Sequence, residues 1–484
     1  MSEQRESQPQ QRSLPRRLLN RMEVNRAVFY ALVSRIWQFV SGPFTMLLIV
    51  AFFSSELQGY YYTFGALIAL QTFVEMGMQV VTLYLASHEW AKLEIDERGY
   101  LTGDAAALAR LRSLTLLVLK WYTVASLLFV GGIGIAGYYF FQSQPAVNIN
   151  WQGPWFCVVG FTALTLVLTP CLSLLDGCDQ VSVTNRYRAL QSVTATLAVW
   201  AAISNGAGLW TCVVISAVRL FWELWLTGVR YRRFFTSLWP ARSGPGVNWS
   251  TEVWPLQWKL AIQAMATYFT SSFVIPLMFE YQGAAVAGQL GLTWTALMTL
   301  QLAAYSWMLA RAPLFGSLVA QNDLTEFNRV FRRLFQVSTT VLIAGGTLFC
   351  LIVWILQLLQ GMDSPNLWEP LQFGWDLVLK LQRRILPLYP TVLLTLALIP
   401  IHVSQCVMAY IRPFKQEPFL LLNTTSQLMT GALVWYLGKT YGPVGAGWGF
   451  LLVGCLLTLP GFLWTLKQFT GKRSGTDFEK KVDS

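Results

Sequence analysis

Long apolar runs alternate with short polar stretches along most of the chain. A helix of about 20 apolar residues spans a bilayer core, because each residue rises ~1.5 Å across ~30 Å of hydrocarbon. The pattern predicts twelve such helices, over residues 28–53, 60–86, 113–141, 154–175, 189–205, 208–229, 259–279, 284–310, 334–360, 385–410, 419–438 and 442–466. We therefore expect an all-α integral membrane protein.

The positions of Lys and Arg predict the orientation of these helices, because positively charged loops stay on the cytoplasmic side. With the amino terminus inside, 28 of the 35 basic residues fall in cytoplasmic segments. Both termini are then cytoplasmic. The first apolar run is too long for a signal peptide and lacks a small-residue cleavage site, so it is expected to remain as the first helix.

Three short sequence echoes indicate an internal repeat. ELQG from Glu56 matches EYQG from Glu280, and GDAAALARLRSL from Gly103 matches NDLTEFNRVFRRL from Asn322. NGAGLW from Asn205 and VGAGW from Val444 form the third pair. Because the echoes occur in the same order, they predict two pseudosymmetric six-helix bundles with parallel topology, related by an axis along the membrane normal.

This repeat divides the chain into five parts. They are a cytoplasmic N-terminal segment, an N-lobe of helices 1–6, a cytoplasmic linker, a C-lobe of helices 7–12 and a cytoplasmic tail. Their predicted limits are 1–27, 28–229, 230–258, 259–466 and 467–484.

Composition supports the membrane assignment and excludes other classes of protein. Hydrophobic residues make up 54% of the chain and charged residues only 12%, about half the charged share of a soluble protein. The net charge of +11 is explained by topology and an anionic inner leaflet, so no nucleic-acid partner is expected. The seven cysteines show neither CxxC nor His-linked spacing, which predicts no disulfide framework, no metal site and no cofactor.

Polar side chains follow one face of four predicted helices, the first two of each half. Because polar groups at membrane depth usually face a cavity or a partner, these helices are expected to surround a central aqueous cleft. The alternative is that the uncharged polar side chains only form hydrogen bonds between neighbouring helices. The candidate substrate-binding residues on these faces are Arg35, Gln38, Gln71, Glu75, Gln263, Trp294, Gln301 and Tyr305.

Three further charged residues lie inside the predicted helices. Arg219 and Glu223 are four residues apart on helix 6, where an ion pair within the helix would explain both. Lys120 lies near the cytoplasmic end of helix 3, from which its amine can reach the interface. Each has a functional alternative: Lys120 and Arg219 as weaker substrate ligands, and Glu223 with Glu75 as ion-coupling carboxylates.

Signatures of an enzyme are missing from the sequence. It contains no GxxxxGK[ST] phosphate-binding loop, and no loop gathers His with carboxylates for acid–base or nucleophilic chemistry. The remaining class is transport, without catalysis by the chain itself.

A family resemblance rests on three segments together with the two six-helix halves. The segments are LDGCDQV at 175–181, FEYQGAAVAGQLG at 279–291 and AYIRPFKQEPF at 409–419. The chain resembles the polysaccharide flippases, for O-antigen or exopolysaccharide, of the multidrug/oligosaccharidyl-lipid/polysaccharide exporter superfamily. The resemblance implies a V of two lobes about a cationic cavity. It also implies alternating access that moves a polyprenyl-diphosphate-linked oligosaccharide to the outer leaflet.

The resemblance gives the candidate residues roles. Arg35 would bind the diphosphate, because a guanidinium is always charged and forks onto phosphate oxygens. Polar and aromatic side chains of helices 2 and 8 would contact the sugars. The expected setting is a bacterial inner membrane, with membrane lipids and polysaccharide synthesis or polymerase machinery as partners of a monomer. A cation-coupled multidrug exporter of the same superfamily, a membrane polymerase and an assembly scaffold remain alternatives.

Overall fold

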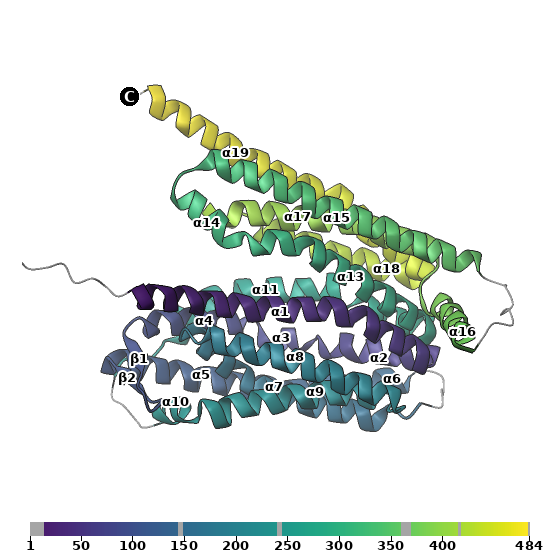
Figure 1. Cartoon of the computed structure of the whole chain (residues 1–484), viewed down its shortest axis with the longest axis horizontal. Helices are drawn as coiled ribbons and strands as arrows, with labels where there is room; N and C mark the ends of the chain where they lie inside the picture. Colours follow the sequence, from purple (N-terminus) through teal and green to yellow (C-terminus); the bar gives the residue numbers. More distant parts are fainter. Residues whose placement is uncertain (1–13, 144–148, 240–243, 360–368, 415–417, 483–484) are drawn as a thin grey trace, which may run out of the picture.

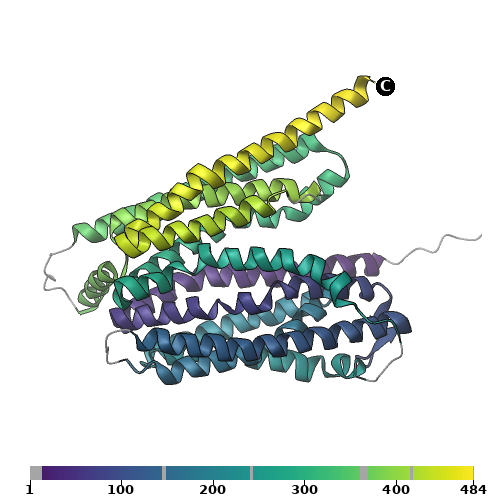
Figure 2. The same ribbon diagram turned by 180° about the vertical axis from the view of Figure 1, so that it is seen from behind.

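The computed structural model describes the chain except residues 1–13, 144–148, 240–243, 360–368, 415–417 and 483–484. Two bundles of long helices meet at one end and diverge at the other, so that the molecule has the shape of a V (Figure 1). Helix α1 begins, and helix α19 ends, at the end where the bundles diverge (Figures 1 and 2). We refer to this as the open end and to the other as the closed end.

The N-terminal bundle holds the first ten helices and one hairpin, in which Glu94 of β1 pairs antiparallel with Thr102 of β2. Two π-helical stretches, Val130–Gly134 and Trp225–Arg230, interrupt its helices. The elements are α1 (Leu14–Phe52), α2 (Ser55–Ile68), α3 (Gln71–Glu75), α4 (Met78–Trp90), β1 (Leu93–Ile95), β2 (Leu101–Gly103), α5 (Ala105–Phe129), α6 (Ile135–Gln142), α7 (Gln152–Gly177), α8 (Val181–Ser204), α9 (Trp210–Leu224) and α10 (Arg232–Ser237).

The second half begins with a π-helical turn, Trp249–Val253, that leads into α11 between the two bundles (Figure 1). A 3₁₀ turn, Arg412–Phe414, and another π-helical stretch, Gly454–Thr458, follow later. The helices are α11 (Trp254–Ser271), α12 (Val274–Gln282), α13 (Ala284–Ala310), α14 (Ala312–Ala320), α15 (Leu324–Leu358), α16 (Glu369–Arg384), α17 (Leu388–Ile411), α18 (Leu420–Val453) and α19 (Leu459–Val482).

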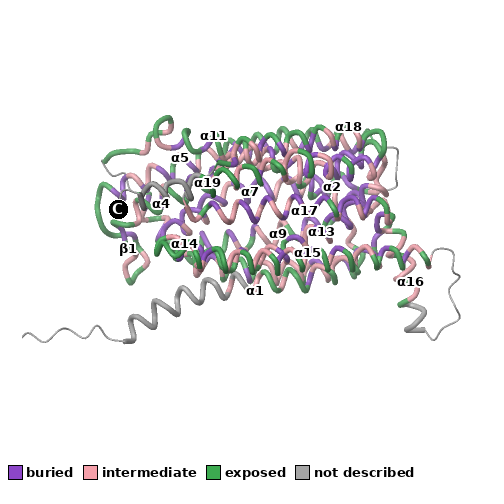
Figure 3. Tube along the Cα trace, turned by 90° about the horizontal axis from the view of Figure 1, so that it is seen from above, coloured by how far each residue is buried: buried purple, intermediate pink, exposed green. Residues whose placement is uncertain are grey.

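In the described part of the chain, seven helices are long and apolar enough to cross a membrane, or up to nine if each bent pair is one span. The bent pairs are Ser55–Glu75 with Met78–Trp90, at 47°, and Trp249–Ser271 with Val274–Gln282, at 45°. Exposed residues lie on the outside of the bundles and buried residues run through their middle (Figure 3). Many of the exposed residues are large and hydrophobic, such as Leu127, Leu348 and Leu456. The fold is therefore that of a multi-pass membrane protein.

One predicted span is broken, and one long helix contains a reversal that the sequence predicts. Predicted helix 2 is broken at Met76 and Gly77, both in the left-handed region with φ of 50° and 69°. Helix α18 reverses at Gly442, with φ of 60°, so that Gly449 returns to lie against Val434. That reversal separates the two segments predicted as helices 11 and 12.

The two halves repeat one packing order. Helix α1 packs on α8 as α11 packs on α18, and α5 packs on α7 as α15 packs on α17. The second sequence echo also has one local role in both halves, because Asp104 and Asp323 each cap the amino end of the following helix, α5 and α15. Such caps satisfy backbone N–H groups that the helix itself leaves unpaired.

The first echo does not have the same place in both halves. Because Ser54 caps α2, ELQG forms the first turn of that helix and does not close the preceding one. EYQG instead ends α12, where Gly283 adopts φ of 88° before α13. ELQG and EYQG therefore do not end equivalent helices, although their sequences match.

The closed end is held by close contact between α2 and α13. A Cβ added at Gly59 would lie 1.9 Å from the carbonyl oxygen of Ala284, and one added at Gly288 would lie 2.9 Å from the nitrogen of Gly59. The amide of Gln58 donates across the same seam to the Gly288 carbonyl at 2.7 Å. Small residues allow this approach, as they do in other membrane helix pairs.

We expect Gly59→Ala to destabilise the protein, because its Cβ cannot fit unless α2 and α13 separate. Overpacking of this kind costs about 1–3 kcal/mol, visible as a lower melting temperature of the purified protein in detergent. Gly65→Ala, on the same helix, is the matched control, since nothing lies within 4 Å of its added Cβ. Equal melting temperatures for the two variants would contradict the tight seam.

Candidate functional site

The apex of the V is a neutral pocket of about 380 Å³ between the bundles. Tyr62 and Ala66 of α2 form its N-terminal wall, while Trp294 and Met298 of α13 form the opposite wall. Ser271 and Ser272, at the break between α11 and α12, also line it. Predicted helices 2, 7 and 8 thus meet here, and none of the lining residues is charged.

Arg35 lies on the face of α1 that is directed toward the C-terminal bundle. Met46, eleven residues and about three turns further along, shares that face and packs against a cluster containing Leu292 and Val353, from α13 and α15. At Arg35 the bundles have diverged, and its side chain is exposed. Within the described residues it makes no hydrogen bond or ion pair.

Arg35 lies within the apolar run of α1. The residues just before it, AVFYALVS at 27–34, are mostly apolar, so Arg35 is about two turns into the predicted span 28–53. Helix α1 begins at the open end (Figure 1), so Arg35 is in the part of this span nearer that end.

A second cavity, of about 530 Å³, lies inside the N-terminal bundle among α1, α4, α7, α8 and α9. Gln38, Gln79, Arg188, Arg219 and Glu223 contribute polar atoms to its wall. This is the size of a typical small-molecule pocket. Gln38, Arg219 and Glu223 are predicted site residues. The contributions of α7 and α8 were not predicted; on α7, Thr169 and Ser173 have no distinctive spacing.

The charges around this bundle cavity are largely paired. Arg219 Nε donates to Glu223 Oε1 at 2.9 Å, and Arg188 Nη2 donates to Asp176 Oδ2 at 2.6 Å. Glu75, just before the break in helix 2, accepts from Gln79 Nε2 at 2.8 Å. The cavity is therefore of mixed charge, and differs from the cationic cavity that the family resemblance implies.

The second oxygen of Glu223, Oε2, is buried and has no hydrogen-bond partner among the described residues. An unsatisfied carboxylate oxygen beside a cavity is a ready acceptor for a proton, a cation or water. The ion pair expected within helix 6 is present, but it leaves one acceptor unused.

Gln301 and Tyr305 lie away from the cleft, contrary to the sequence expectation. The amide of Gln301 is buried between α13 and α17, where Nε2 contacts His402 Nδ1 at 3.3 Å and donates to Gln405 Oε1 at 3.0 Å. His402 is fully buried and also contacts Ser338 Oγ at 3.0 Å. The Tyr305 hydroxyl donates to the Gln405 carbonyl at 3.4 Å. Gln301 and Tyr305 do share one face of α13, as their spacing predicts, but that face contacts α17.

The other predicted residues are spread over different surroundings. Lys120 is exposed on the outer face of α5, between exposed Leu116 and Val124, so it does not reach either cavity. Trp294 lines the apex, but its Nε1 is used, donating to the Ser271 carbonyl at 2.8 Å. Gln71 and Gln263 are half-buried, and no side-chain bond is recorded for either within the described ranges.

Helix α16 crosses the closed end, in a segment that the sequence predicts as a loop. Its basic residues bond to the end of α1: Arg384 Nη2 donates to the Phe53 carbonyl at 2.6 Å, and Lys380 Nζ to the Ala51 carbonyl at 3.4 Å. Cations satisfy free carbonyls at a helix carboxyl end and interact favourably with its dipole. A segment of the second half thus fastens α1 of the first.

No protein-family model and no curated protein sequence matches the chain. Solved structures match its fold. An inward-facing multidrug resistance transporter of the MATE family, in the MOP superfamily, has a TM-score of 0.64 at 11% identity, over 92% of this chain and 99% of that one. The lipid II flippase MurJ, in an inward closed conformation, has a TM-score of 0.53 at 13% identity, over 91% and 87%.

A MOP superfamily transporter from Pyrococcus furiosus, described by the reverse polarity of its binding pocket, has a TM-score of 0.51 at 11% identity, over 93% of this chain and 95% of that one. At these identities the likeness shows the fold alone. The chain has the fold of MOP superfamily transporters.

Arg219→Ala is expected to destabilise the N-terminal bundle, because it leaves Glu223 buried without its cation. We expect a loss of about 1–3 kcal/mol, below the value for a fully buried pair, since Arg219 is partly exposed. The double variant Arg219→Ala/Glu223→Gln should recover most of the melting temperature. A double variant no more stable than Arg219→Ala would show that the pair has no structural role.

Arg384→Ala should loosen the closed end, because it removes the bond to the Phe53 carbonyl. Spin labels at two exposed positions toward the open end, Tyr84 on α4 and Leu421 on α18, should then show more of a shorter-distance population. Arg383→Ala is the control, since its exposed side chain makes no recorded bond in the described residues. Identical distance distributions for Arg384→Ala and Arg383→Ala would show that the bond from Arg384 to the Phe53 carbonyl does not hold the closed end together.

Proposed function

We propose that the protein is a flippase that moves a polyprenyl-diphosphate-linked oligosaccharide from the inner to the outer leaflet by alternating access. The observation that carries this proposal is the unpaired Arg35 on the cleft face of α1. An arginine without a carboxylate partner, facing a space between two bundles, is suited to bind an anionic substrate group.

The location of Arg35 suits the capture of such a substrate. The diphosphate of a lipid-linked sugar lies at the headgroup level of the leaflet, and Arg35 is about two turns from the N-terminal limit of the predicted span 28–53. The substrate would enter at the open end of the V, with its prenyl tail remaining in the lipid. We take the open end to be cytoplasmic, as the positive-charge distribution predicts.

The neutral apex supports a role in sugar transfer. Tyr62 and Trp294 line it, together with Thr295 and Thr299. Hydroxyl groups can bond to sugar hydroxyls, and aromatic rings offer flat apolar surfaces. A diphosphate held lower, at Arg35, would leave the sugars to occupy this neutral space.

Energy for transfer can come from two sources. An inside-negative potential assists outward movement of a substrate carrying about −2, at ~2.3 kcal/mol per charge per 100 mV. Glu223, which lines the cavity inside the N-terminal bundle, and Glu75, which accepts a bond from the lining residue Gln79, would couple transfer to H⁺ or another cation. The free oxygen of Glu223 supports this role.

The second candidate function is a cation-coupled multidrug exporter. The mixed-charge cavity of about 530 Å³ favours it, because that volume suits a drug-sized molecule better than an oligosaccharide. In this reading Glu75 and Glu223 would attract a cationic drug, and Arg35 would have no substrate role.

The wider setting belongs to the same proposal. It comprises two pseudosymmetric lobes, residues 28–229 and 259–466, joined by the linker 230–258. We place the chain as a monomer in a bacterial inner membrane, beside the enzymes that synthesise or polymerise surface polysaccharide. The chain itself is not expected to act as an enzyme.

Arg35→Ala should abolish or strongly reduce polymer export when the protein complements a flippase-null strain. Arg35→Lys should also be impaired, because an ammonium group cannot fork onto the diphosphate. Membrane abundance should stay unchanged, since Arg35 makes no bond in the described structure.

Arg332→Gln, a charge loss on an exposed residue of α15, serves as the control. A drug-resistance assay on the same strains separates the two functions. Normal export by Arg35→Ala would remove the assigned role, and drug resistance lost with Glu223→Gln but not with Arg35→Ala would favour the exporter.

A further inference from the structure

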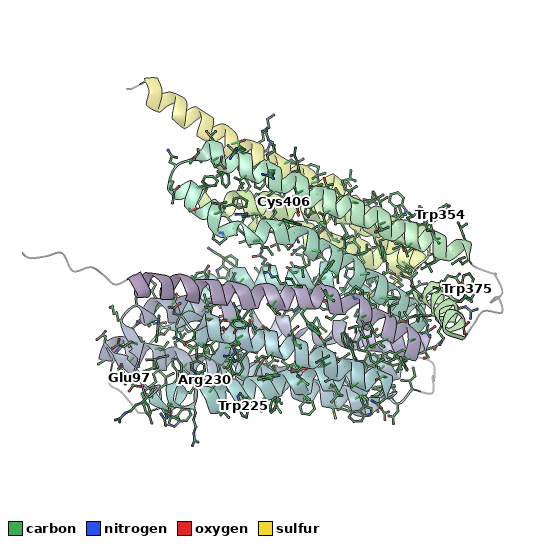
Figure 4. All side chains as sticks on the ribbon, viewed as in Figure 1. Glu97, Trp225, Arg230, Trp354, Trp375 and Cys406 are labelled. Atoms are coloured by element: carbon green, nitrogen blue, oxygen red, sulfur yellow. The ribbon has the colours of Figure 1, made fainter. Side chains whose placement is uncertain are left out.

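A third cavity lies on the outer surface of the N-terminal bundle, away from the cleft and near the open end. It has a volume of about 210 Å³ and is formed by α5, α7, α10 and the π-helical stretch Trp225–Arg230. Figure 4 shows Trp225 and Arg230 along this outer edge of the bundle. We call it the α5–α10 crevice. It plays no part in the proposed transport path.

Arg112 supplies a positive charge to the crevice without a partner. Its Nε is buried and has no hydrogen-bond acceptor among the described residues. No Asp or Glu lines the crevice. By contrast, Arg110, two residues earlier, donates to both Glu89 and Glu252. A buried donor left unsatisfied costs free energy, so Arg112 is prepared for an anion from outside the protein.

The rest of the wall is apolar and open to the surroundings. Leu116 is 42% exposed and Trp239 is 73% exposed, and both border the crevice together with Leu119. Exposed leucines on a membrane helix face acyl chains, and tryptophan is enriched at the level of the headgroups. A water-soluble anion would gain nothing from this apolar wall.

The π-helical stretch creates the space. Gly228 lies in it and lines the crevice, and an added Cβ at this position would meet nothing within 4 Å. One-turn π-helical insertions are frequent at functional sites in membrane and soluble helices. Here the widened turn and the missing side chain leave room beside Arg112.

We propose that the α5–α10 crevice binds an anionic glycerophospholipid of the surrounding leaflet. The headgroup phosphate pairs with Arg112, and one acyl chain runs along Leu116 and Leu119. Charge complementarity selects an anionic over a zwitterionic lipid, because basic pockets between helices at this boundary bind acidic headgroups. The binding does not depend on which substrate the protein transports.

Native mass spectrometry of the purified full-length protein tests this directly, with phosphatidylglycerol or phosphatidylcholine added. The wild-type protein should retain phosphatidylglycerol in preference to phosphatidylcholine. Arg112→Gln should weaken phosphatidylglycerol binding about tenfold or more, as expected for loss of a charge-assisted bond. Arg332→Gln, which removes a charge elsewhere at the open end, should leave it unchanged.

Gly228→Leu provides a second test that does not alter charge. Its Cβ would meet no protein atom within 4 Å and the rest of its side chain would occupy crevice space, so it should lower lipid retention while the melting temperature in lipid-free detergent stays the same. Inorganic phosphate alone should neither stabilise the protein nor compete with the lipid. Unchanged phosphatidylglycerol binding in both variants, or full competition by inorganic phosphate, would overturn the proposal.

Discussion

The close approach of α2 and α13 at Gly59 and Gly288 is the contact on which the arrangement of the molecule depends. The backbones come so near that no side chain fits between them, and Gln58 bonds across the gap. Because membrane helices gain little hydrophobic energy from meeting in lipid, association relies on such close packing and on hydrogen bonds. With one end closed by this seam, the bundles are separated at the other end, which gives this conformation its V shape and its cleft.

The two halves share a packing order but differ in their polar interiors. The N-terminal bundle encloses paired charges, with Arg219 beside Glu223 and Arg188 beside Asp176. The C-terminal bundle instead contains a hydrogen-bonded network of His402 with Gln301 and Ser338. A repeat therefore preserves the helix arrangement while each half carries different chemistry. Ion coupling, if the N-terminal carboxylates perform it, would belong to one half only.

Much of the fold follows from the sequence, because long apolar runs and cap residues act locally. Asp104 and Asp323 cap helices that begin at Ala105 and Leu324, earlier than the predicted limits of 113 and 334 but just ahead of the same apolar runs. The direction in which a helix face points depends on tertiary packing, which periodicity does not reveal. The polar face of α13 was thus predicted to line the cleft, yet Gln301 meets His402 in the interior. Helix α16 lies in a segment predicted as a loop, because the bonds of its basic residues are made to the distant end of α1.

The basic residues of α16 also explain why Lys380 and Arg384 depart from the usual distribution of positive charge. They cap carbonyls at the end of α1, so their charge is needed where they lie. If the termini lie inside the cell, as the positive-charge distribution predicts, these cations face outward, and an inside-negative membrane potential would draw them toward the protein. A membrane potential would then strengthen the contact between α16 and α1, and its loss would weaken it. The resting conformation would depend, in part, on the electrical state of the membrane.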